Sequence, residues 1–112
     1  MPDFKNKIRS TLDGVETEVI TLVGDTIKRR RREYEDAAKR FYSEMKADLE
    51  RFGVMLLEGQ ISRDEFELLS MNRAELVKVQ VLEQTAVAKA RFEALSMQIA
   101  KIGIKAVFAL LL

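Results

Sequence analysis

Apolar side chains recur every three or four positions along most of the 112-residue chain. Such spacing places them on one face of an amphipathic helix. Over residues 26–58 the face consists of Tyr34, Ala38, Phe41, Met45, Leu49, Phe52 and Leu56. A looser stripe follows, made of Leu69, Leu76, Val79, Leu82 and Ala86, and the pattern sharpens again from Phe92. No proline interrupts residues 63–112, so we predict a long antiparallel helical hairpin with arms over residues 26–58 and 63–110.

The corner between the two arms carries several local signals. Gly59 stands where the first arm would end, and glycine adopts the left-handed capping conformation without steric cost. Ser62 and Glu65 have the spacing of a capping box, in which each side chain accepts a hydrogen bond from the other residue's amide. Ile61 and Phe66 have the spacing of a hydrophobic staple across the same turn. The corner is therefore predicted at residues 59–66.

This corner resembles the helical-hairpin element of the short C-terminal oligomerisation domains of bacteria. The resemblance covers residues 56–69 only, and its matching residues are Leu56, Leu57, Gly59, Ile61, Ser62, Glu65 and Phe66. It implies a self-associating, non-catalytic helical module. In that family the element closes the chain, whereas here it lies in the middle of the chain.

The first residues predict a further helix over about 4–23. Phe4, Ile8, Leu12, Val15, Val19 and Leu22 have helical spacing. Residues 14–24 also alternate in the manner of a strand and are rich in valine and threonine, so a strand is the alternative there. We favour the helix because the rest of the chain offers a strand no partner. The sequence thus predicts one all-α domain over residues 1–112.

Four consecutive arginines, Arg29, Arg30, Arg31 and Arg32, form the strongest charge run in the chain. Successive helical residues turn by about 100°, so these side chains would point all round the axis and not along one stripe. Glu33, Glu35 and Asp36 follow four residues after Arg29, Arg31 and Arg32. The whole chain has 19 basic and 18 acidic residues. We therefore expect a salt-bridged, exposed helix segment, with contact to an acidic partner or nucleic acid as the alternative.

The C-terminal segment is apolar on almost every face. After Glu93 it contains no acidic residue, and its only charges are Lys101 and Lys105. One hairpin partner cannot cover such a helix, so we expect it to be buried in an oligomer. The predicted interface consists of Leu95, Ile99, Ile102, Val107, Phe108 and Leu111. A helix lying on a membrane surface, with the two lysines at headgroup level, is the alternative.

The composition removes most catalytic chemistry. Histidine and cysteine are both absent, which excludes the usual zinc ligand sets and histidine-dependent nucleophilic catalysis. We therefore expect neither an enzyme nor a bound cofactor or metal.

The predicted function is a non-enzymatic structural or scaffolding module, or a protein-interaction module, that forms a homo-oligomeric helical bundle and binds an unidentified protein partner. A peripheral membrane protein using its C-terminal helix is the alternative, and nucleic-acid binding through the arginines is third and disfavoured. No stretch has the length of a membrane span, so we expect a cytoplasmic protein, peripheral to a membrane in the alternative case.

Overall fold

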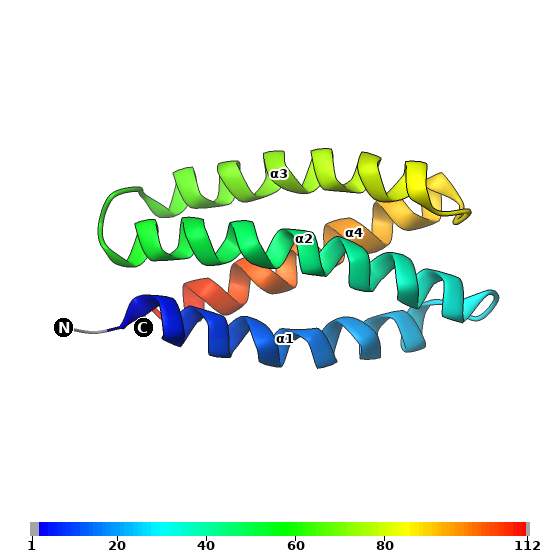
Figure 1. Cartoon of the computed structure of the whole chain (residues 1–112), viewed down its shortest axis with the longest axis horizontal. Helices are drawn as coiled ribbons and strands as arrows, with labels where there is room; N and C mark the ends of the chain where they lie inside the picture. Colours follow the sequence, from blue (N-terminus) through cyan, green and yellow to red (C-terminus); the bar gives the residue numbers. More distant parts are fainter. Residues whose placement is uncertain (1–2, 112) are drawn as a thin grey trace.

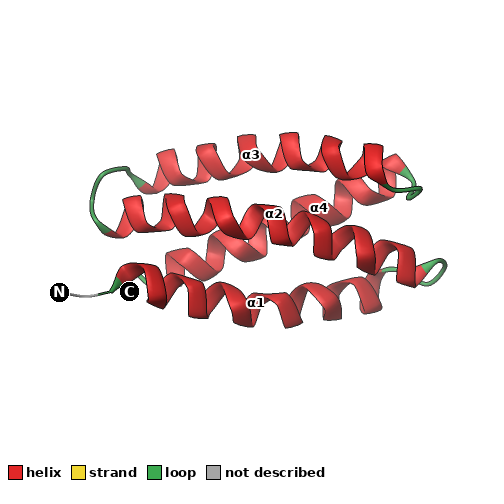
Figure 2. Cartoon of the chain, viewed as in Figure 1, coloured by secondary structure: helices red, strands yellow, loops and turns green. Residues whose placement is uncertain are grey.

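The computed structural model describes residues 3–111 and contains four antiparallel helices in an up-down-up-down order (Figure 1). They are α1 (Phe4–Thr26), α2 (Arg31–Leu57), α3 (Arg63–Gln84) and α4 (Lys89–Ala109). Over the described residues everything between the helices is turn or loop, with no strand (Figure 2). The all-α prediction is confirmed, and residues 14–24 belong to a helix.

The helices form a four-helix bundle measuring 47 × 23 × 18 Å. Both α2 and α4 contact all three other helices, whereas α1 and α3 lie on opposite sides of the bundle. The start of α1, the end of α4 and the α2–α3 connection are at one end of the bundle (Figure 1). The α1–α2 and α3–α4 connections are together at the other end.

The prediction of one long second arm is wrong. The chain leaves the helix at Thr85 and starts α4 at Lys89, so residues 63–109 form two helices that pack against each other. A continuous arm would measure about 70 Å at 1.5 Å per residue, longer than the whole bundle. The first arm is confirmed over most of its length, but α2 begins at Arg31 and not at residue 26.

A tertiary contact stabilises the break between α3 and α4. Thr85 and Ala88 both have extended backbone conformations, and Ala88 has no side chain that could cap α4. The Tyr34 hydroxyl of α2 accepts a hydrogen bond from the amide of Ala88, the residue just before α4, over 3.1 Å. Val87 is buried beside this contact. The start of α4 thus depends on a residue far away in the sequence, which a local capping rule cannot detect.

The corner between α2 and α3 has the predicted structure. The Ser62 hydroxyl accepts from the Glu65 amide at 3.1 Å, and the Ser62 amide donates to the Glu65 carboxylate at 3.0 Å. Gly59 has a φ of 79°, the left-handed conformation expected of a glycine at a helix end. The capping box is therefore confirmed.

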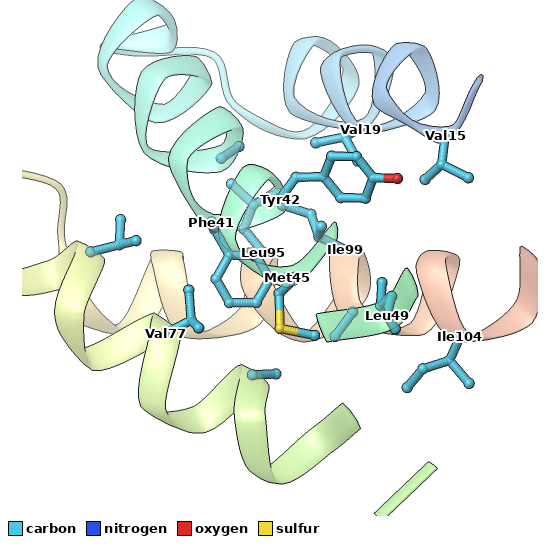
Figure 3. Packing of buried hydrophobic residues seen from close by; sticks show 14 of the residues in the cluster. Val15, Val19, Phe41, Tyr42, Met45, Leu49, Val77, Leu95, Ile99 and Ile104 are labelled. Atoms are coloured by element: carbon cyan, nitrogen blue, oxygen red, sulfur yellow. The ribbon is translucent and has the colours of Figure 1, made fainter. Parts of the chain in front are cut away.

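All four helices contribute to the hydrophobic core. Figure 3 shows Val15 and Val19 of α1 near Tyr42 of α2, with Leu95 and Ile99 of α4 behind them. The rings of Phe41 and Phe92 meet edge to face at 6.1 Å between centroids, which joins α2 to α4. The Tyr42 hydroxyl donates to the Leu12 carbonyl of α1. Burial raises the pKa of Tyr42, so this phenol keeps its proton.

Gly103 brings α4 close to α2. A methyl group in place of its hydrogen would lie 2.6 Å from Leu49 Cδ1, a distance at which the Leu49 side chain or the two helices must shift. Gly14 of α1 differs, because nothing lies within 4 Å of a methyl group added there.

Replacing each of these two glycines by alanine should therefore have opposite effects. We expect Gly103→Ala to lower the free energy of unfolding by about 1–3 kcal/mol, because overpacking outweighs the gain in helix propensity. Gly14→Ala should raise it by about 0.5–1 kcal/mol. Urea denaturation of both variants measures this difference, and equal shifts would contradict the close α2–α4 packing.

Removing the Tyr34 hydroxyl should loosen the start of α4. We expect Tyr34→Phe to lower the free energy of unfolding by about 1 kcal/mol and to speed hydrogen exchange of the Ala88 amide. Tyr42→Phe is the matched control, since it also removes a buried hydroxyl but leaves the Ala88 amide bonded. Amide exchange measured by NMR distinguishes the two variants. An unchanged exchange rate of the Ala88 amide in Tyr34→Phe would show that this hydrogen bond does not form.

Candidate interaction surface

The strongly exposed large hydrophobic side chains among residues 3–111 all lie on α3. They form what we call the α3 apolar face, which consists of Leu68 (61 % exposed), Leu69 (36 %), Leu76 (58 %) and Val79 (49 %). Leu69, Leu76 and Val79 are seven and three residues apart, so they share one side of the helix, with the exposed Asn72 between them. Leu68 widens this side.

A second set of residues on α3 faces the core. Phe66, Ala74, Val77 and Val81 are buried, and Ser70 is buried among them. The helix is thus apolar on two sides, of which the bundle covers one. A contiguous apolar surface left uncovered is characteristic of a binding site.

An ion-pair network sets how α3 lies on α2. The Asp48 carboxylate is 7 % exposed and accepts from Arg73 Nε of α3 at 2.7 Å. Its other oxygen accepts from Arg51 at 3.1 Å. A buried carboxylate that lost these partners would be costly, so the network favours the rotation of α3 that places Arg73 toward α2. The α3 apolar face then points away from the bundle.

The charges around the α3 apolar face are mainly negative. Glu65, Glu67 and Glu83 are all exposed on α3. The cations of the same helix are engaged within the chain. Arg73 is bonded to Asp48, and Lys78 to Glu75 at 2.7 Å, a hydrogen bond that raises the pKa of Lys78. A partner therefore meets an apolar stripe with a negative rim.

The residues predicted to form an oligomer interface lie within the bundle. Leu95, Ile99 and Val107 are buried in the core of the single chain. Ile102, Phe108 and Leu111 are half-buried against that core. Much of this segment is thus covered within one chain, because α4 contacts α1, α2 and α3 together.

Phe108 illustrates how the single chain covers the segment. Its ring lies 5.6 Å from that of Phe66 on α3, and the Arg63 guanidinium lies 5.6 Å from its centroid. Both neighbours belong to the first turn of α3, where Ser62 and Glu65 form the confirmed capping box.

The four arginines are not all on a helix. Arg29 and Arg30 belong to the α1–α2 connection, and Arg30 has a left-handed φ of 57° at the start of α2. Arg30 pairs with Glu33, and Arg31 pairs with Glu35 at 3.4 Å. The Arg31–Glu35 pair confirms one prediction. Among residues 3–111, neither Arg29 nor Arg32 forms the predicted pair with Glu33 or Asp36.

The α3 apolar face was not identified as a surface from the sequence. Its residues Leu69, Leu76 and Val79 have helical spacing and were expected to face the other arm. The competing stripe from Phe66 to Val81 contains the small residues Ser70 and Ala74, which make it look weaker although they allow closer packing. The presence of two apolar stripes on one helix is therefore the sequence signal that could have predicted an exposed apolar face.

The described part of the chain contains no cluster of three or more histidine, cysteine or acidic side chains arranged to hold a metal ion. In the same part, every helix is too short or too polar to cross a membrane. Comparison with known proteins finds no matching family model, no matching curated protein and no matching solved structure.

Phe108→Asp tests whether the chain itself covers its C-terminal segment. We expect the substitution to lower the free energy of unfolding by about 3 kcal/mol, because it places a carboxylate against Phe66. Ala109→Asp is the control, because it adds the same charge at an exposed neighbouring position. It should cost less than about 1 kcal/mol. Urea denaturation at two protein concentrations measures both, and a midpoint that depends on concentration would instead place Phe108 in an oligomer interface.

Proposed function

We propose that the protein is a non-enzymatic protein-interaction module that uses the α3 apolar face to bind a helix of another protein. One observation carries this proposal: among residues 3–111, the exposed large hydrophobic side chains are concentrated on α3, while the other large apolar side chains are buried or half-buried. Scattered surface leucines need no explanation, but three leucines and a valine on one side of a helix form an apolar stripe. An amphipathic helix is the natural complement of such a stripe.

The partner helix should carry basic residues beside its apolar stripe. Glu65, Glu67 and Glu83 form a negative rim, and the nearby cations Arg73 and Lys78 already have partners in the chain. Complementary charge speeds association and excludes wrong partners. An acidic partner would meet repulsion at both ends of the stripe.

A second copy of this chain fits the α3 apolar face less well. Two α3 helices that overlap their stripes in antiparallel fashion would place Glu65 of one copy opposite Glu83 of the other. Like charges at that distance are unfavourable. The homo-oligomer expected from the sequence therefore has less support than a different protein.

Binding to a membrane surface also has less support. The apolar residues of α4 that would enter the lipid are buried or half-buried against the other helices. The exposed apolar surface is on α3, where the negative rim would repel anionic headgroups.

Two designed peptides test the proposal directly. One is an amphipathic helix of leucine and lysine, and the other has the same leucine pattern with glutamate in place of lysine. We expect the lysine peptide to bind saturably, with perturbed amide signals along α3, and the glutamate peptide to bind at least tenfold more weakly. Fluorescence anisotropy measures both affinities, and NMR chemical shifts locate the site.

Matched substitutions identify the surface involved. Leu76→Gln should weaken binding of the lysine peptide at least tenfold while leaving the fold intact, because the side chain is mostly exposed. Ile20→Gln makes a comparable apolar-to-polar change at a half-buried position of α1, on the opposite side of the bundle, and should leave the affinity for the lysine peptide unchanged. Equal loss in both variants, or equal affinity for both peptides, would reject the proposal. Self-association abolished by Leu76→Gln would replace the foreign helix with a second copy.

A further inference from the structure

Three basic side chains from two segments that are distant in the sequence line one hollow at the end of the bundle. Lys28 and Arg29 come from the α1–α2 connection, and Arg91 comes from the first turn of α4. The hollow has a volume of about 460 Å³, and Thr26 and Ile27 complete its lining. The two connections that lie at this end are at the right of Figure 1.

The charge of this hollow is not balanced by its own lining. Its three cations are exposed, and no acidic residue lines it. Among residues 3–111, none of the three forms an ion pair. Three other surface hollows with basic residues differ in this respect, because Glu44 lines one and Glu50 lines the other two.

The consecutive arginines have two different environments: Arg30 and Arg31 form ion pairs, whereas Arg29 lines the hollow. Arg30 and Arg31 are neutralised by Glu33 and Glu35. The left-handed backbone at Arg30 is uncommon for a residue other than glycine, and it separates Arg29 from the α2 helix that follows. Arg29 is thereby available to the hollow together with Lys28. The amide end of α4 adds partial positive charge from the other side, near Arg91.

We propose that this hollow binds a small molecule carrying phosphate groups. Guanidinium groups form paired hydrogen bonds with phosphate oxygens, and lysine adds a point charge. The volume lies within the range of small-ligand sites, and the partly apolar lining can hold a non-phosphate portion of the ligand. The site is separate from the α3 apolar face and goes beyond the function proposed above.

Inorganic pyrophosphate is the probe for this site. We expect it to bind saturably to the full chain in NMR titrations, shifting the amide signals of residues 26–31 and 89–92. Lys28→Gln and Arg91→Gln should each weaken binding about tenfold, since hydrogen bonds between charged groups are the strongest kind. Lys101→Gln is the matched control, because it removes an exposed lysine elsewhere on the surface of α4. It should leave the affinity unchanged.

Several results would overturn the proposal. One is an NMR titration in which the amide shifts rise linearly with pyrophosphate and do not saturate. Another is an equal loss of pyrophosphate affinity in Lys28→Gln and Lys101→Gln. Either result would indicate unspecific ionic binding. Vesicles containing an anionic phospholipid, and a single-stranded oligonucleotide, are tested in parallel. If either binds through Lys28 and Arg91 while pyrophosphate does not, the surface recognises a macromolecule and not a small ligand. Circular dichroism checks that each variant is folded. If Arg91→Gln disturbs α4, the pyrophosphate affinity of Lys28→Gln, which lies in the α1–α2 connection, tests the proposal.

Discussion

The packing of α4 among the other three helices is the interaction on which the rest of this structure depends. Its apolar side chains lie on several sides of the helix, so covering them requires more than one neighbour. The chain meets this requirement by reversing direction between Thr85 and Ala88. Tyr34 satisfies the amide that the reversal leaves without a partner, and Gly103 allows α4 to approach α2 at Leu49.

Once α4 fills the fourth position, the remaining surface follows from it. Much of the C-terminal segment is engaged in the chain's own core, with Leu95, Ile99 and Val107 buried and Ile102, Phe108 and Leu111 half-buried. The surplus of apolar surface appears instead on α3, whose orientation is fixed by Arg73 on the buried Asp48. The same reversal brings Arg91 to the end of the bundle where Lys28 and Arg29 lie. Both proposed sites thus depend on one chain reversal.

Local patterns in the sequence predict much of the fold. The corner at Ser62 and Glu65 was predictable because both partners of each hydrogen bond lie within three residues. The break at Thr85 was not, because its stabilising partner Tyr34 is 54 residues from Ala88 and no glycine or proline marks it. The α3 apolar face was missed because small residues on the buried side made the exposed stripe look like the stronger one. The convergence of Lys28, Arg29 and Arg91 has no local signature.

The distance between α3 and the end of α4 tests the chain reversal most directly. The protein contains no cysteine, so cysteines introduced at the exposed positions Glu67 and Ala109 accept spin labels without interference. Pulsed electron paramagnetic resonance, with the labelled protein diluted into unlabelled protein, measures the distance between the two spin labels within one chain. Adjacent antiparallel helices predict a separation below about 25 Å. A distance near 60 Å, expected for roughly 42 residues of continuous helix, would show that the second arm is unbroken and that the bundle does not close within one chain.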